Sequence, residues 1–163
     1  MTPDQHNDAV QVRQLELTDR LVYQRFLQAI ELADIRSRIL GGAVKVEAAP
    51  IDDLLTVSGK YGTAYGALLH TGELLGVARL APTRAKPSEV EFAILVRTDH
   101  KRRGIGRALM QFVIEQAKQQ GYRLLVAETL RDNVALRSLA GSFGFQASTG
   151  DDVDLVHLTL NLS

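Results

Sequence analysis

A turn containing two glycines, which joins a short apolar strand to an amphipathic helix, constrains the fold more than any other feature of this sequence. Residues 90–96 read as a strand, and apolar residues recur at helical spacing from Ile105 to Ala117. Gly104 and Gly106 open the helix, and because neither has a Cβ atom, the backbone there can approach a ligand closely. The first N–H groups of a helix have no partner inside it, so the turn predicts an anion site suited to phosphate.

The charges around the turn agree with this prediction. Five cations flank it, and Asp99 is the only acid in the run: the cations are Arg97, Lys101, Arg102, Arg103 and Arg107. A charge run alone is typical of a solvated loop, but here it coincides with the glycines, the strand and the helix. We therefore interpret the segment as a phosphate-binding turn.

Two well-known phosphate motifs do not fit. The third glycine of the dinucleotide fingerprint would fall at Leu109, and only one strand-helix-strand unit is evident, whereas a dinucleotide fold needs more. The Gly-Lys-Ser or Gly-Lys-Thr of a P-loop is absent. A nucleotide-binding oxidoreductase is thus a weak alternative.

The order of predicted elements indicates an α/β (α+β) fold with a mixed, mostly antiparallel central sheet and helices on both faces. A strand at 10–17 precedes a helix that Thr18-Asp19 would cap and a short helix at 51–57. Strands at 64–69 and 74–80 flank a hairpin turn, and the unit at 90–127 favours a parallel crossover. A helix capped by Asp132 or Asn133 follows, and 153–162 closes the chain as one or two strands.

Composition narrows the class of protein. The chain has 163 residues, which fits one domain at 9–163 after a flexible tail at 1–8. Lys+Arg and Asp+Glu number 19 each, so we expect neither nucleic acid nor a membrane as partner. Without cysteine there is no thiolate site, and the four histidines lack metal-ligand spacing, so no metal is expected. The polar N-terminus and the lack of a long apolar run predict a cytoplasmic protein.

The segment from Val90 to Phe145 resembles the GCN5-related N-acetyltransferases, the GNAT family. In that family the turn has the pattern Gln/Arg-x-x-Gly-x-Gly/Ala, and here it reads Lys101-Arg102-Arg103-Gly104-Ile105-Gly106. Lys101 departs from the usual Gln or Arg and lacks their planar donors. A second signature, consisting of Asn133, Leu139 and Gly144-Phe145, follows at the family's separation. Segments 76–80, 91–97 and 104–110 most resemble the catalytic domain of bacterial protein lysine acetyltransferases.

This resemblance implies an acetyl-CoA N-acyltransferase fold and an acetyl-CoA cosubstrate. The residues that it implies for cofactor binding are Leu95, Val96, Lys101, Arg102, Arg103, Gly104, Ile105, Gly106, Arg107 and Asn133. The backbone of Leu95 and Val96 would bind the pantetheine arm and stabilise the oxyanion, and the turn would hold the pyrophosphate. Asn133 would bond the pantetheine arm or cap a helix, and one residue can do both.

Glu91 is the candidate general base, as the family's glutamate at this strand position implies. Strand alternation places it opposite Phe92 and Ile94, so it faces the cleft if those two pack under helices. Many family members protonate the leaving thiolate with a tyrosine, but the matching position here is Ala140. Glu128 and Asp132 either attract a cationic amine or are solvated acids, and His157 reads as a surface or core residue.

The sequence therefore predicts direct transfer of acetyl to a primary amine, with protein lysine as the first choice of acceptor. A small-molecule amine or a peptide N-terminus is the alternative within the enzyme class. A non-catalytic acyl-CoA-binding module is the alternative outside it. Residues 153–162 could also form an intermolecular edge, which makes a homodimer one candidate assembly.

Overall fold

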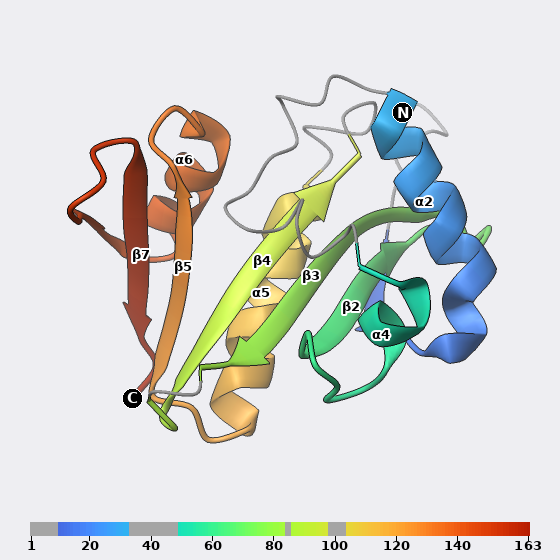
Figure 1. Cartoon of the computed structure of the whole chain (residues 1–163), viewed down its shortest axis with the longest axis horizontal. Coiled ribbons are helices and arrows are strands. Elements are labelled where there is room, and N and C mark those ends of the chain that lie inside the picture. The colour runs from blue at the N-terminus through green and yellow to red at the C-terminus, as the bar shows by residue number, and fades with distance from the viewer. Residues whose placement is uncertain (1–9, 33–48, 84–85, 98–103) are drawn as a thin grey trace, which may run out of the picture.

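The computed structural model describes residues 10–32, 49–83, 86–97 and 104–163, and the predicted tail at 1–8 lies outside them (Figure 1). Its centre is a seven-stranded sheet in the order β1-β2-β3-β4-β5-β7-β6. The strands are β1 (Gln11–Gln14), β2 (Thr63–Leu68), β3 (Leu74–Pro82), β4 (Glu89–Val96), β5 (Leu124–Leu130), β6 (Gln146–Thr149) and β7 (Leu155–Asn161). The helices of the described chain are η1 (Leu17–Asp19), α2 (Arg20–Leu32), α4 (Ile51–Leu55), α5 (Ile105–Gln119) and α6 (Val134–Ser142).

The predicted mixed sheet is confirmed. Five of its neighbouring pairs are antiparallel, and β4 and β5 alone run parallel. Helix α5 makes the crossover between these two strands, as parallel strands require. The strand that carries Glu91 therefore lies in the middle of the sheet, beside the strand that leads to Asn133.

Two hydrophobic clusters, one on each face of the sheet, hold the helices in place. Phe92 and Ile94 of β4 belong to the cluster that contains Leu109 and Val113 of α5. On the other face, Leu95 packs in a cluster with residues of α2 and α4. Figure 1 shows α5 behind the sheet and α2 and α4 in front of it. Side-chain alternation along β4 thus sends successive residues into different cores.

A glycine in β3 lets α5 lie close to the sheet. A Cβ atom at Gly76 would come 2.9 Å from Leu109 Cδ1 and 3.0 Å from Ile105 Cγ2. At the far end of α5, Gly121 has φ +88°, as a residue that ends a helix in the left-handed region should. Gly104, which is the N-cap of α5, and Gly121 therefore mark the two ends of the helix.

Two predictions at the level of elements are wrong. The strand β6 was not predicted, because all four of its residues are exposed and show no apolar alternation. The first helical turn begins after Glu16 rather than at Thr18-Asp19, since the Glu16 N–H donates to Asp19 Oδ2 at 2.9 Å. Asp19 also accepts from both Arg13 Nη atoms at 2.9 Å, which occupies the side chain that the prediction made a cap.

None of the described helices is both long enough and apolar enough to cross a lipid bilayer.

Candidate active site

The sheet opens between β4 and β5. Their parallel pairs are Glu89 with Leu124, Val90 with Leu125 and Glu91 with Val126, and no later pair joins the two strands. Both strands nevertheless continue, β4 to Val96 and β5 to Leu130. Figure 1 shows the strands together at one end and diverging toward their carboxyl ends. The edge of β4 beyond Glu91 therefore presents backbone groups that β5 does not pair.

Beside this opening, the N-terminus of α5 provides free amide donors. The first intrahelical bond runs from Ala108 N–H to Gly104 O at 3.0 Å, so the N–H groups of Ile105, Gly106 and Arg107 precede it. Gly104 has φ +76°, a conformation that other residues rarely adopt, and among the described residues no atom beyond its chain neighbours lies within 4 Å of the position of a Cβ there. The described part of the turn thus leaves space beside Gly104 and offers the three amide donors that follow it.

The structure describes two of the five predicted cations, while Lys101, Arg102 and Arg103 lie outside the described residues. Arg107 is exposed, its guanidinium carbon lies 5.1 Å from the ring centre of Phe143, and its Nη2 donates to Ser142 Oγ at 3.1 Å. Arg97 Nη1 donates to Glu73 Oε1 at 2.6 Å. Both side chains thus have protein partners: Arg107 reaches α6, and Arg97 reaches the β2–β3 turn.

Glu91 faces the side of the sheet that its sequence position predicts. Phe92 and Ile94 are buried under α5, and Glu91 is exposed on the opposite side, at the last β4–β5 pair. The pKa of Glu91 is raised, first because the carboxylate is partly withdrawn from water and then because Glu128 and Glu89 lie near it. A carboxylate with increased proton affinity suits a general base.

Glu128 has a partner that sequence reasoning missed. His157 of β7 is directly opposite Glu128 of β5, and its Nδ1 lies 3.4 Å from Glu128 Oε2. The pairing follows from the β5–β7 register, which joins residues 29 positions apart and has no motif. The alternation of apolar residues in β7, with Val156 and Leu158 buried, was the one available signal that His157 faces the other side.

Asn133 caps α6, which is one of its two predicted roles. Its Oδ1 accepts from Leu136 N–H at 3.2 Å, and its Nδ2 donates to Thr129 Oγ1 at 3.2 Å. Thr129 is completely buried at the end of β5. The asparagine is therefore held between the strand and the helix that border the opening.

The position of the usual tyrosine acid is occupied here by a small apolar residue. Ala140 is completely buried in the core under α5. Tyr65 packs in the same core, with its ring centre 5.3 Å from that of Phe112, and burial raises its pKa. Among the described residues, no three histidine, aspartate or glutamate side chains are grouped as metal ligands.

Comparison with known proteins agrees with this geometry. A sequence profile of the Acetyltransferase (GNAT) family matches residues 31–145, which include β4, the glycine turn, α5, β5 and α6. The GNAT domain of PAT from S. lividans superposes with a TM-score of 0.75 at 21% identity, covering 94% of this chain and 90% of that one. At this identity the likeness concerns the fold, and it confirms the predicted acyl-CoA N-acyltransferase fold.

Two bacterial relatives are similar in sequence. The protein named acetyltransferase PA5475 of Pseudomonas aeruginosa is 28% identical over 153 residues, which are 91% of this chain and 82% of the relative. The L-methionine sulfoximine/L-methionine sulfone acetyltransferase of the same organism is 33% identical over 103 residues, 56% of this chain and 60% of that protein.

Proposed function

Because this chain belongs to the Acetyltransferase (GNAT) family, whose cosubstrate is acetyl-CoA, we propose that it transfers acetyl directly to a primary amine with Glu91 as the general base. One observation carries the proposal. The β4–β5 ladder ends at Glu91, so a carboxylate with a raised pKa stands where the sheet opens toward the free amides of α5. A thioester held along β4 would reach the site from the end that binds phosphate.

Each part of the cofactor has a counterpart in the chain. The amides at the start of α5 suit the pyrophosphate, and the cations Lys101, Arg102, Arg103 and Arg107 add charge around it. The unpaired edge of β4 at Leu95 and Val96 suits the amide-containing pantetheine arm, because amides pair with a strand edge as another strand does. Asn133 would add a bond from the other side of the opening.

The acceptor must lose a proton before it attacks. A lysine amine has a reference pKa of about 10.4, so near neutral pH it is mostly protonated and non-nucleophilic. Glu91 takes this proton directly or through a water, and the neutral nitrogen then bonds to the thioester carbonyl carbon. A backbone N–H near Leu95 and Val96 stabilises the oxyanion. The carbon–sulfur bond then breaks, and a thiol with a reference pKa of about 8.5 leaves without a dedicated acid.

We propose protein lysine as the acceptor, on the likeness of the segments around Glu91 and Gly104 to bacterial protein lysine acetyltransferases. One observation favours a small amino-acid amine instead. The relative that acetylates L-methionine sulfoximine or sulfone is 33% identical over 56% of this chain. Thiol release with a lysine peptide and with methionine sulfone separates these two acceptors.

Calorimetric titration with acetyl-CoA tests the cofactor and its location together. The informative variant is Gly104→Asp, and its matched control is Gly121→Asp at the other end of α5. Both glycines have positive φ, and within the described parts of the chain a Cβ at either position meets no atom within 4 Å beyond the chain neighbours, so the local strain is comparable. We expect binding by the wild type and Gly121→Asp and a loss of about tenfold or more in Gly104→Asp, where a carboxylate faces the phosphates.

A second substitution at Gly104 separates the effect of the added charge from the effect of the added side chain. Gly104→Asn keeps the size of the side chain and tolerates positive φ, so it should retain more affinity than Gly104→Asp. Folded wild-type protein that does not bind acetyl-CoA would contradict the proposed function. Equal losses in Gly104→Asp and Gly121→Asp would contradict the location of the phosphate site.

A further inference from the structure

Glu91 and Glu128 share one side of the sheet at the point where it opens. Val126 of β5 pairs with Glu91, and Glu128 is two residues further along the same strand. Residues two apart on a strand point to the same side, so the Glu128 side chain lies on the Glu91 side. The neighbouring Ala127 points the other way, into the core under α5. Glu128 therefore stands across the opening from the β4 residues that follow Glu91.

His157 lies on the far side of Glu128. The two residues are direct partners across the β5–β7 ladder, with 3.4 Å between His157 Nδ1 and Glu128 Oε2. Side-chain exposures of 45% for His157 and 49% for Glu128 leave both free to exchange protons with water. A Cβ at Gly150 would come 2.8 Å from His157 Nε2, so the ring fills the space that a side chain there would need. Glu91, Glu128 and His157 thus form a row across three strands.

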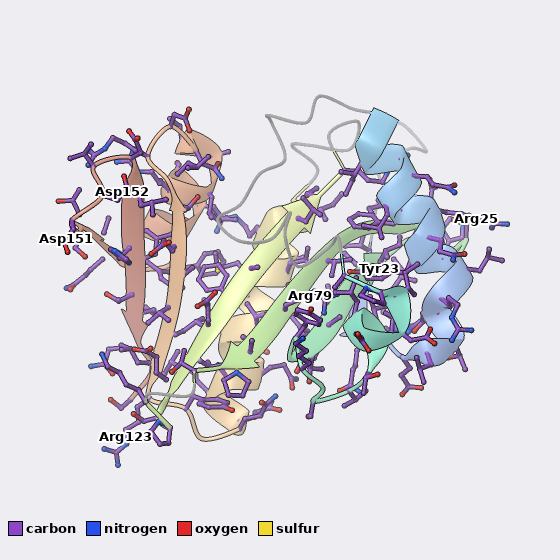
Figure 2. All side chains as sticks on the ribbon, in the orientation of Figure 1. Tyr23, Arg25, Arg79, Arg123, Asp151 and Asp152 are labelled. Carbon is purple, nitrogen blue, oxygen red and sulfur yellow. The ribbon has the colours of Figure 1, made fainter. Side chains whose placement is uncertain are left out.

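Among the described residues, further charged groups near this row lie on β4, on β3, after β5 and in the β6–β7 connection. Glu89 precedes Glu91 on the same side of β4. On β3, Arg79 pairs with Ala93, but its guanidinium donates to Tyr23 Oη at 2.6 Å and to the Leu54 carbonyl at 2.9 Å. Asp132 follows β5, and the exposed Asp151 and Asp152 lie in the β6–β7 connection (Figure 2). The β6 partner of His157 is the uncharged Ser148.

We propose that Glu128 and His157 tune Glu91: the Glu128 carboxylate strengthens Glu91 as a proton acceptor, and a protonated His157 weakens this effect. The inference rests on the proposed function of Glu91. Glu128 and His157 act through Glu91 and not on the reacting atoms, so they are positioning residues.

The sign of each effect follows from charge. A negative charge near Glu91 makes its ionised form less stable, so the Glu128 carboxylate contributes to its raised pKa. When the His157 ring carries a proton, its positive charge lies 3.4 Å from Glu128 Oε2 and offsets the charge of Glu128. A proton on His157 therefore makes Glu91 a weaker base. The ammonium proton that Glu91 accepts passes to water, and the second proton of the amine nitrogen ends on the thiol.

Titration of Glu91 in the free protein, followed by carboxyl carbon NMR, tests the tuning without any substrate. Glu128→Gln removes a negative charge and should lower the pKa of Glu91. His157→Gln removes the positive charge of a protonated imidazole beside Glu128 and should raise the pKa of Glu91. The matched control is Thr159→Val on β7, which pairs with Val126 and carries no charge. It should leave the titration unchanged.

The pH dependence of kcat supplies the second readout. The low-pH limb should move to lower pH in Glu128→Gln and to higher pH in His157→Gln. A purely structural role would not shift the two variants in opposite directions. An unchanged Glu91 titration, or shifts in the same direction, would overturn the tuning. If the wild type transfers no acetyl group, the proposed function fails, and the NMR titration still decides whether the three residues are coupled.

Discussion

At the scale of single residues, Glu91 combines two properties that seldom stabilise a folded protein. It is partly withdrawn from water, and it lies near two other carboxylates, so its ionised form is less stable in the folded chain than in the unfolded chain. Because its pKa is raised on folding, the folded state binds more protons than the unfolded state between the two pKa values. Stability contributed by the protonated form is therefore lost as pH rises through this range.

Glu91→Gln separates activity from stability. We expect kcat to fall by about 100-fold or more, since a general base contributes roughly 10²- to 10⁴-fold. We also expect the thermal midpoint at pH 7 to rise slightly, because glutamine keeps the shape and removes the disfavoured charge. Glu115→Gln on the exposed side of α5 is the control for both measurements. A variant that loses activity together with stability would indicate a structural role for Glu91.

At the scale of elements, apolar alternation predicted those features of the site that depend on burial. The opposite orientation of Glu91 and Phe92, the extent of α5 and the capping by Asn133 all follow from local spacing. The end of the β4–β5 ladder at Glu91 could not be predicted, because both strands continue with strand-forming residues beyond it. The strand β6 and the Glu128–His157 pair escaped prediction because neither is marked by burial.

The approach of α5 to the sheet depends on Gly76, and its substitution should show this. Gly76→Ala places a methyl group within 3.0 Å of Leu109 and Ile105, and overpacking of this kind costs about 1–3 kcal/mol. Because α5 carries the free amides, its displacement should also weaken acetyl-CoA binding. Chemical denaturation and calorimetry measure the two effects.

Gly141 provides the matched control for Gly76. It lies exposed within α6, and a Cβ there meets no atom of the described residues within 4 Å, its own helix backbone aside. Gly141→Ala should therefore stabilise the protein by about 0.5–1 kcal/mol through helix propensity alone. Equal effects of the two substitutions would contradict the close packing of α5 against β3.

At the scale of the whole molecule, two cores on opposite faces must be joined through one sheet. On the face of the sheet that α2 and α4 cover, a buried arginine connects both helices to β3. Arg79 of β3 is 4% exposed and donates to the Tyr23 hydroxyl of α2 and the Leu54 carbonyl of α4. Figure 2 labels Arg79 on β3 and Tyr23 on α2. A buried charge is tolerated only with such partners, so both helices are fixed to β3.

Tyr23→Phe should loosen this face of the molecule. It removes one hydrogen bond to a charged group, which is worth about 1.5–3 kcal/mol, and leaves the ring to pack as before. We expect faster amide hydrogen exchange in α2 and α4 and little change in α5. Tyr61→Phe, at the margin of the same core, is the control. Uniform acceleration across the chain would argue against a local connection.

The short ladder between β4 and β5 determines how firmly the two halves of the sheet are joined to each other. Only three residue pairs join the half of the sheet made of β1 to β4 to the half made of β5, β7 and β6. The sheet therefore has two inner strand edges, on β4 and β5 beyond this ladder, in addition to its two outer ones. A ligand that bonds to both inner edges links the two halves of the sheet. When it leaves, the three β4–β5 pairs are again the only strand pairing between the halves among the described residues.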